Sequence, residues 1–452
     1  MKRIRCNALV YCILLITLCF FLTASGYLSW LYHLTDFVDA SKADWMSEVV
    51  GYLFQAAGFL LFGLAVKKNH TIVENKKAFF VVLCLDVIFI LAATLSPNLV
   101  LALLCGYLMN IFHGIVAGFY CSYLAVFVKW NHCALAFGLS YGLASIGTWL
   151  FSLPVGGTFL HTPYALASYL LFAVVIGCML FFDVEKEAKT DNSCNVSYPF
   201  QLILFAGLTV LLFSLVKNIG FYFPMADISS GIKLEWSRLF YAVGLIAAGW
   251  INDHNRLHGA IACLVALVSP FVLLFLQKEL TVSILIWILG YLLFGFFTVY
   301  RMVLFVDISK QNQSYLFLAG FGMLFGRIGD ALGALGGMLF KEYTLFAVLI
   351  TVVLYSISIV LFFRIFHTLY YPSETVLATE EPSHIADFSK EYDFSPREIE
   401  VFSKLLDGHS NAEISALLFI SENTVKFHVR NVLKKTGTKR RTELIALYES
   451  KQ

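Results

Sequence analysis

Long runs of apolar residues constrain this chain more than any other feature, because each run is about long enough to cross a lipid bilayer as a helix. One crossing needs ~20 residues, and we count twelve such runs in the sequence, of which the eighth is the weakest. They lie near residues 8–31, 45–66, 78–95, 99–128, 133–153, 163–183, 200–222, 237–251, 259–277, 281–306, 315–340 and 343–366. A mean hydropathy of +0.77 with 14% charged residues excludes a soluble globular domain of this length. We therefore expect an all-α helix bundle embedded in a lipid bilayer.

The charges between these runs predict the orientation of the bundle. If both termini are cytoplasmic, twelve Lys or Arg residues lie inside and four lie outside, as positively charged inner loops require. The inner set is Lys2, Arg3, Arg5, Lys67, Lys68, Lys76, Lys77, Lys129, Lys186, Lys189, Arg256 and Lys310, and the outer set is Lys42, Lys233, Lys278 and Lys341. The first run is too long for a cleaved signal peptide and lacks a cleavage-like site, so we expect it to remain.

After residue 366 the chain becomes polar and charged. Residues 367–394 read as an acidic linker, because from Pro372 to Phe394 the segment carries six acids against Lys390 alone. Residues 395–452 then hold ten Lys or Arg and seven Asp or Glu, a net charge of +3. This division predicts a membrane domain at residues 1–366 and a separate polar domain after the linker.

The polar domain reads as helix, turn, helix. Ser395 opens the first helix with Glu398 in its first turn. Gly408 ends that helix, and Asn411 and Ser421 cap two more. In the third helix the predicted buried stripe is Val425, Val429, Val432 and Leu433, and the predicted open face is Asn423, Lys426, Phe427, Arg430 and Lys434. Such an exposed, cationic helix fits the major groove of DNA.

Each residue of this open face has an expected contact. Lys426 and Arg430, one turn apart, are the candidates for base edges, and Phe427 is the candidate for a thymine methyl group. Phosphates are expected to meet the start of the helix and the basic cluster that follows it. The residues concerned are Ser421, Asn423 and Thr424, and then Lys434, Lys435, Lys439, Arg440 and Arg441. The alternative is a solvated helical hairpin with ordinary surface lysines.

The polar domain resembles the LuxR-type helix-turn-helix domain over its whole length. The matching residues are Ser395, Pro396, Arg397, Glu398, Glu400, Val401, Gly408, Ser410, Asn411, Glu413, Ile414, Leu418, Ile420, Ser421, Glu422, Thr424, Val425, Lys426, His428, Val429 and Arg441–Leu444. Ser415, Leu417 and Thr436 depart from the family pattern. The resemblance implies a four-helix domain that binds DNA as a homodimer. A domain of this kind on a polytopic protein indicates the cytoplasmic (inner) membrane of a bacterium.

The membrane domain shows a faint internal repeat between residues 1–183 and 200–366. Gly58, Gly63 and Lys67 have the same spacing as Gly244, Gly249 and Asp253. Two halves of six runs, with GWINDHNR at 249–256, resemble the major facilitator superfamily of transporters. The copy in the first half, GLAVKKN, lacks the Asp of the family's loop signature. The alternative is that these glycines only let helices pack closely.

Ionisable and amide side chains inside apolar runs are the candidate ligand-binding groups, since such groups usually line a cavity or form pairs. If the resemblance holds, the central cavity gathers Asn110, His113, Lys217, Asn218 and Arg301. Their cations favour an anionic or carboxylate ligand. The alternatives are that Lys217 and Arg301 extend to the membrane surface and that His113 only packs. Arg327 and Asp330, three residues apart, are expected to neutralise each other.

No other chemistry is indicated by the sequence. The ten Cys residues show no metal-ligand spacing, and no phosphate loop, nucleophile elbow or zinc-protease motif is present, so no cofactor, metal site or enzyme is expected. The leading hypothesis is a membrane-bound one-component transcription regulator that senses a small molecule. The alternatives are an active secondary transporter with a regulatory DNA-binding tail and a membrane tether that senses nothing.

Overall fold

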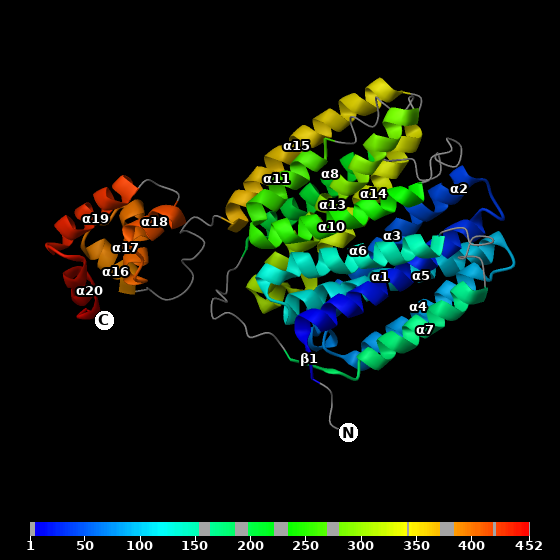
Figure 1. The fold of residues 1–452 in the computed structure, drawn as a ribbon, viewed down its shortest axis with the longest axis horizontal. Coiled ribbons are helices and arrows are strands. Elements are labelled where there is room, and N and C mark those ends of the chain that lie inside the picture. The colour runs from blue at the N-terminus through cyan, green and yellow to red at the C-terminus, as the bar shows by residue number, and fades with distance from the viewer. Residues whose placement is uncertain are drawn as a thin grey trace. The chain divides into compact units, whose positions relative to one another are not determined.

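The computed structural model describes residues 5–152, 163–185, 198–220, 234–268, 280–340, 343–370, 384–418 and 422–451. By its internal contacts the chain divides into two compact units, Met1–Tyr371 and Pro372–Gln452 (Figure 1). The first unit is a bundle of long helices, and the second is a small group of short helices. The predicted all-α class is therefore correct apart from one short pair of strands.

The first half of the first unit contains a helix for each of its six predicted runs. These are α1 (Ala8–Leu34), α3 (Tyr52–Lys68), α4 (Lys76–Thr94), α5 (Leu99–Phe127), α6 (Cys133–Ser152) and α7 (Pro163–Met179). A short helix α2 (Ala40–Asp44) and a π-helical stretch η1 (Trp45–Gly51) lead into α3. Two 3₁₀ turns, η2 (His70–Ile72) and η3 (Trp130–His132), follow α3 and α5.

The second half also contains a helix at each of its six predicted runs. Its elements are α8 (Phe200–Gly220), α10 (Leu234–His254), α11 (Arg256–Ala266), α13 (Leu280–Gln311), η5 (Gln313–Leu318), α14 (Phe321–Leu339) and α15 (Thr344–Tyr370). Asparagine caps start several helices: Asn98 accepts from the Leu101 N–H at α5, and Asn255 accepts from the Leu257 N–H at α11. These caps let polar turns of a few residues connect long apolar helices.

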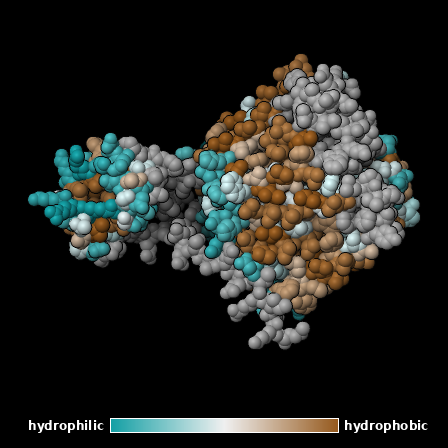
Figure 2. All heavy atoms as spheres, in the orientation of Figure 1, coloured by the Kyte–Doolittle hydropathy of each residue, from teal (hydrophilic) through white to brown (hydrophobic). Residues whose placement is uncertain are grey.

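Nine helices among the described residues are long and apolar enough to cross a membrane. The full set of twelve predicted crossings is thus not confirmed. Over their described apolar parts, Ala165–Met179 in α7 and Arg256–Ala266 in α11 are too short for one crossing. The described residues on the face of the unit drawn in Figure 2 form a largely hydrophobic surface, and α15 exposes Leu345, Val353 and Val360 by more than half. Such a surface suits contact with lipid better than contact with water.

Close helix contacts explain two of the repeated glycines. A Cβ on Gly58 of α3 would lie 2.0 Å from the Ile111 carbonyl oxygen of α5, and one on Gly244 of α10 would lie 1.9 Å from the Leu292 carbonyl oxygen of α13. Both distances are far below van der Waals contact, so only glycine fits. The two glycines hold equivalent positions in the two halves, since each joins the second helix of its half to the fourth.

The described strands add one feature that the sequence did not predict. β1 (Arg5–Asn7) pairs in parallel with β2 (Asp183–Glu185), with Cys6 opposite Val184. The pair ties the start of the first half to its end. Three residues on each side are too few for an alternating pattern to be visible in the sequence.

The second unit contains five helices among its described residues. They are α16 (His384–Glu391), α17 (Pro396–Leu406), α18 (Asn411–Leu418), α19 (Glu422–Thr436) and α20 (Arg441–Glu449). The last four are the helices implied by the resemblance. Their shared core includes Val401, Phe402, Leu405, Ile414, Val425, Val432 and Leu444.

The segment predicted as a linker, 367–394, differs from that description at both ends. α15 continues to Tyr370, and α16 lies within the segment as part of the second unit. The reason is Phe388, which is 3% exposed and stacks on Phe402 with ring centroids 5.4 Å apart. The six acids of the segment are typical of a linker, and a single buried phenylalanine does not change that composition. Residues 371–383 lie outside the described part of the chain.

Candidate functional site

Helix α19 presents one buried face and one open face. Val425 and Val432 are fully buried, and Val429 and Leu433 pack against them. The residues predicted for the open face, Asn423, Lys426, Phe427, Arg430 and Lys434, are all exposed. Phe427 is 58% exposed, which is unusual for a phenylalanine and leaves its ring available to a partner. Thr424 lies half-buried near the start of the helix, and Ser421 lies outside the described residues.

Capping residues set where α17 begins and ends and where α18 begins, the two helices that pack against α19. Ser395 and Glu398 form a reciprocal capping box at the start of α17: the Ser395 N–H donates to the Glu398 carboxylate at 2.8 Å, and the Glu398 N–H donates to the Ser395 hydroxyl at 3.4 Å. Gly408 adopts a φ of 87°, which confirms it as the stop. The second cap is Ser410 and not the predicted Asn411, because Ser410 makes the same reciprocal pair with Glu413.

The basic cluster after α19 divides into two groups. Lys435 Nζ donates to the Glu398 carboxylate at 2.7 Å, and the Arg441 guanidinium donates to the carbonyls of His409 and Leu405 at 2.6 and 2.8 Å. These two cations hold the unit together. Within the described part of this unit, no ion pair engages the exposed side chains of Arg430, Lys434, Lys439 and Arg440.

Two carboxylates form ion pairs with lysines of α19. Lys426 pairs with Glu422 at 2.9 Å, and both side chains are about half exposed, so a stronger anion can displace this weak contact. Burial alone would raise the pKa of Glu398, but the hydrogen bonds from Lys435 and from the Ser395 N–H outweigh it and lower that pKa below its usual value. Glu398 is therefore a charged part of the framework.

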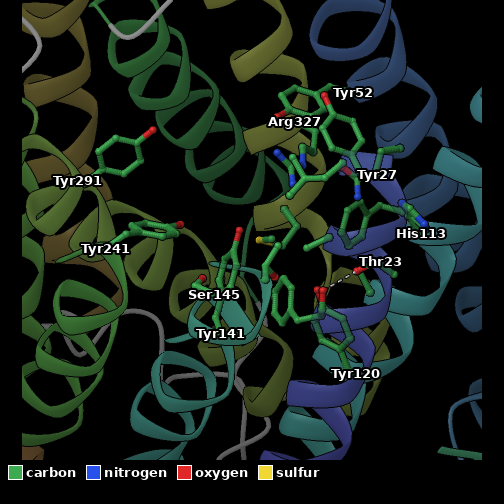
Figure 3. Close-up of a pocket in the computed structure, with 18 residues that line it drawn as sticks. Thr23, Tyr27, Tyr52, His113, Tyr120, Tyr141, Ser145, Tyr241, Tyr291 and Arg327 are labelled. Atoms are coloured by element: carbon green, nitrogen blue, oxygen red, sulfur yellow. Dashed lines mark hydrogen bonds between the residues drawn. The ribbon is translucent and has the colours of Figure 1, made fainter. Parts of the chain in front are cut away.

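A cavity of about 300 Å³ lies inside the first unit (Figure 3). Helices of both halves line it, from α1, α3, α5 and α6 to α10, α13 and α14. Its walls are rich in aromatic rings and carry hydroxyl and amide groups, one histidine and one arginine. The lining residues are Phe20, Thr23, Ala24, Tyr27, Leu28, Tyr52, Gln55, Phe59, His113, Ala117, Tyr120, Tyr141, Ser145, Thr148, Tyr241, Tyr291, Met323 and Arg327.

Of the five residues predicted for ligand binding, only His113 lines this cavity. Its Nε2 lies 3.3 Å from Asp86 Oδ1, and both side chains are buried. Asn110 is fully buried and donates to the Gly106 carbonyl at 2.8 Å. The other three predicted residues, Lys217, Asn218 and Arg301, come together elsewhere, at Asp330.

Asp330 is the centre of a buried charge cluster. Its carboxylate forms an ion pair with Lys217 at 2.9 Å and accepts a hydrogen bond from Arg301 at 3.1 Å, and Arg327 lies 3.5 Å away. The Asn218 amide donates to the Asp330 carbonyl at 2.8 Å. The expected Arg327–Asp330 pair is present, but Asp330 shares its charge with two further cations from α8 and α13. Sequence spacing could not show this, because the partners are about 30 and 110 residues apart.

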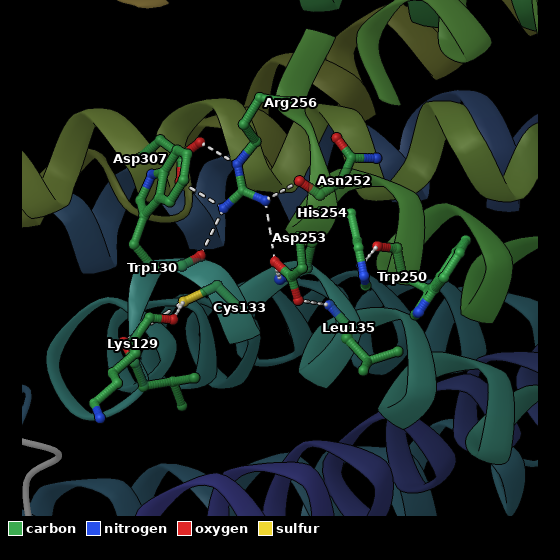
Figure 4. A network of polar contacts seen from close by, with 12 residues as sticks. Lys129, Trp130, Cys133, Leu135, Trp250, Asn252, Asp253, His254, Arg256 and Asp307 are labelled. Atoms are coloured by element: carbon green, nitrogen blue, oxygen red, sulfur yellow. Dashed lines mark hydrogen bonds and ion pairs between the residues drawn. The ribbon is translucent and has the colours of Figure 1, made fainter. Parts of the chain in front are cut away.

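A second polar network joins the two halves around Arg256 (Figure 4). The Asp253 carboxylate accepts from the Ala134 and Leu135 N–H groups at the start of α6, at 3.0 and 2.7 Å. Arg256 donates to Asp307 and Asp253 at 2.9 and 3.0 Å, and to the Trp130 carbonyl at 2.7 Å. The network thus fastens α10 and α13 of the second half to the η3–α6 corner of the first half.

Comparison with known proteins identifies the second unit. Residues 393–448 match the family described as bacterial regulatory proteins, luxR family. The chain is 43% identical over 68 residues to an uncharacterised transcriptional regulatory protein, YhcZ, of Bacillus subtilis, covering 15% of this chain and 32% of YhcZ. It is 52% identical over 50 residues to the CsgBAC operon transcriptional regulatory protein of Escherichia coli, covering 11% and 23%.

A third relative is the nitrate/nitrite response regulator NarP of Escherichia coli, 42% identical over 52 residues, or 12% of this chain and 24% of NarP. The chain thus spans about a third or less of the length of the curated relatives it matches. The C-terminal unit contains a LuxR-type helix-turn-helix domain. The family match covers residues of that unit alone, and the first unit has to be interpreted from its own structure.

Proposed function

We propose that the protein is a membrane-bound one-component transcription regulator, in which the first unit senses a small molecule and the LuxR-type domain binds specific DNA. The observation that carries the proposal is the combination, in one chain, of an open cationic recognition helix and a bundle of apolar helices that lines a cavity. Ligand binding would favour one arrangement of the two halves, and that arrangement would alter how the DNA-binding domains pair or meet DNA.

In this proposal, different residues of the recognition helix and of the cluster that follows it contact different parts of the DNA. Lys426 and Arg430 would reach base edges in the major groove, and the exposed Phe427 ring would contact a thymine methyl group. Lys434, Lys439 and Arg440 have no internal ion pair among the described residues and would neutralise phosphates. Asn423 and Thr424, together with Ser421, would meet phosphate at the start of the helix. Binding as a homodimer follows from the family resemblance.

We further propose that the first unit spans the bacterial cytoplasmic membrane with both termini in the cytoplasm. The excess of lysine and arginine in the predicted inner loops supports this orientation. Arg256 and Lys310 of that inner set lie at one end of the bundle, where Lys310 donates to the Ala125 carbonyl at 2.9 Å. In this orientation the LuxR-type domain is on the side where DNA is available.

The test is to sequence the DNA fragments that are recovered with the tagged full-length protein. A Lys426→Ala, Arg430→Ala variant removes two exposed cations from the recognition helix. The matched control is an Arg397→Ala, Lys404→Ala variant, which removes two exposed cations from α17 that already pair with Glu400 and Asp407. We expect sharp peaks with a shared motif, lost in the first variant and kept in the second. Peaks that survive in both variants would contradict the proposed reading helix.

A working transporter with a regulatory tail is the second candidate, because a central cavity between two fastened halves is also what a transporter needs. It predicts ligand uptake that survives removal of residues 395–452, whereas a sensor would show saturable binding without flux. A third candidate, a tether that senses nothing, predicts unchanged transcription when Lys217 or Arg301 is replaced. Uptake assays on the chain without residues 395–452, and reporter assays on the Lys217 and Arg301 variants, separate the three candidates.

A further inference from the structure

Arg327 is the one cation of the Asp330 cluster that also lines the cavity. Lys217 and Arg301 approach the Asp330 carboxylate more closely, at 2.9 and 3.1 Å, and neither lines the cavity. Arg327 lies 3.5 Å from the same carboxylate, and its side chain is 17% exposed, whereas that of Arg301 is 3% exposed. Asp330 is therefore neutralised by its two closer partners, and part of the Arg327 side chain remains accessible from the cavity.

Charge counting supports the same conclusion. Three cations, Lys217, Arg301 and Arg327, lie within 3.5 Å of the single carboxylate of Asp330. A cation that is taken out of water needs an anionic partner or hydrogen-bond acceptors. The remaining positive charge makes an anion the favoured occupant of the Arg327 end of the cavity.

The geometry of the guanidinium favours a planar anion. The Arg327 Cζ lies 4.3 Å from the centroid of the Tyr52 ring, and Tyr27 stacks on Tyr52 with centroids 5.8 Å apart. A guanidinium that rests on an aromatic face presents its N–H edge to acceptors in its own plane. A carboxylate accepts two such parallel hydrogen bonds.

The rest of the cavity suits an aromatic ring. Phe20 stacks on Tyr141 with centroids 4.0 Å apart and an interplanar angle of 9°, and its centroid lies 4.9 Å from that of Tyr120. All three rings line the cavity, and Tyr120 and Tyr141 lie on the side away from Arg327 in the close-up view (Figure 3). Aromatic walls bind a flat ring through stacked and edge contacts. At ~30 Å³ for each water-sized group, a volume of 300 Å³ accommodates a ligand of about ten non-hydrogen atoms.

We propose that the cavity binds a small aromatic carboxylate, with its carboxylate on Arg327 and its ring among Phe20, Tyr120 and Tyr141. This inference rests on the proposed sensing function, since it names the class of ligand that the first unit would sense. It also revises the ligand site expected from the sequence, in which Lys217 and Arg301 were the anion-binding groups. Those two cations instead neutralise Asp330, and they affect the ligand only through Arg327.

The test uses benzoate as the probe and full-length protein in detergent micelles, with calorimetric titration and thermal unfolding as readouts. Cyclohexanecarboxylate keeps the carboxylate and the ring size without aromaticity, and benzyl alcohol keeps the aromatic ring without the charge. We expect saturable binding of benzoate, with at least tenfold weaker binding of each analogue. Arg327→Gln should weaken benzoate binding at least tenfold. Arg364→Gln, which changes an exposed arginine of α15 outside the cavity, should leave it unchanged.

A second variant covers the case in which Arg327→Gln does not fold. Tyr141→Leu removes a stacking wall and should weaken benzoate binding more than it weakens cyclohexanecarboxylate binding. Equal binding of benzoate and cyclohexanecarboxylate would overturn the aromatic part of the proposal. Equal binding of benzoate and benzyl alcohol would overturn the carboxylate part, and no saturable benzoate binding at millimolar concentration would overturn the whole.

The same samples distinguish this inference from the proposed function. Benzoate binding with an operator affinity that does not respond to benzoate would leave the cavity assignment intact and refute sensing. Specific operator binding without any aromatic-acid binding would leave the regulator intact and refute the ligand class. Each result therefore bears on one of the two proposals alone.

Discussion

Lys434 and Lys435 are adjacent lysines of α19, and we expect their replacement by alanine to affect different properties: stability for Lys435 and DNA binding for Lys434. Lys435 Nζ lies 2.7 Å from the carboxylate of Glu398, whose side chain is 5% exposed, whereas Lys434 is exposed and has no internal ion pair among the described residues. Lys435→Ala would leave a buried carboxylate without its cation. Lys434→Ala would remove only a contact with phosphate.

The expected sizes follow from these contacts. A hydrogen bond to a charged group contributes ~1.5–3 kcal/mol, and because the Lys435 side chain is 34% exposed we expect Lys435→Ala to cost about 1–2 kcal/mol. For a domain of this size that loss lowers the unfolding temperature by about 5–15 °C. Lys434→Ala should leave the unfolding temperature unchanged and reduce the slope of log affinity against log salt by about 0.9.

Circular dichroism of a fragment covering residues 372–452, which has a hydrophobic core of its own, measures the unfolding temperature. DNA binding at a series of salt concentrations measures the slope. The pH dependence is a third check. Because the folded pKa of Glu398 is lowered, the stability that Lys435 contributes is complete above the unfolded pKa of ~4.3 and is lost as the pH falls through the folded pKa. Equal losses of stability in the two variants would refute the division of the basic cluster.

Two further predictions concern the first unit. Arg256→Gln would remove the Arg256 cation from the Asp307 carboxylate, which is 6% exposed, and should cost ~3–5 kcal/mol. The measurement is a lower unfolding temperature in detergent that Arg364→Gln does not show. Gly58→Ala would place a methyl group 2.0 Å from a carbonyl oxygen of α5 and should abolish the recovery of folded protein. Gly336→Ala, whose methyl group would lie 3.3 Å from its nearest neighbour, should be tolerated. Normal recovery of both variants would contradict the close contact at Gly58.

The second unit was predictable because its signals are local. Ser395, Glu398 and Gly408 act within one helical turn of their own positions, and the structure uses each as expected. The error of one residue at the second cap has the same origin, since Ser410 and Asn411 are both good caps and only the position of Glu413 decides between them. The role of Lys435 was hidden, because its partner lies 37 residues earlier in the chain.

The helices of the first unit could be predicted from the sequence, but the polar residues that line its cavity could not. An apolar run shows where a helix lies but not how that helix is rotated about its axis, and rotation decides which polar group faces the cavity. Lys217 and Arg301 turn toward Asp330, and Arg327 turns toward the cavity. The tyrosines within the apolar runs carried a usable signal, since Tyr27 and Tyr52 place phenol groups inside the unit where phenylalanine would have been the simpler choice.

The difference in the ligand's binding free energy between two arrangements of the protein limits how far the ligand can shift the equilibrium between them. Moving a two-state protein from 1:99 to 99:1 takes ~5.5 kcal/mol of differential binding. One carboxylate contact to Arg327 that exists in only one arrangement supplies ~1.5–3 kcal/mol, so a single chain would respond in a graded way. Two chains that bind one DNA site together would add the effects of two ligands, about 3–6 kcal/mol in all. In this proposal, pairing on DNA is therefore what makes a weak contact in the membrane sufficient for a switch.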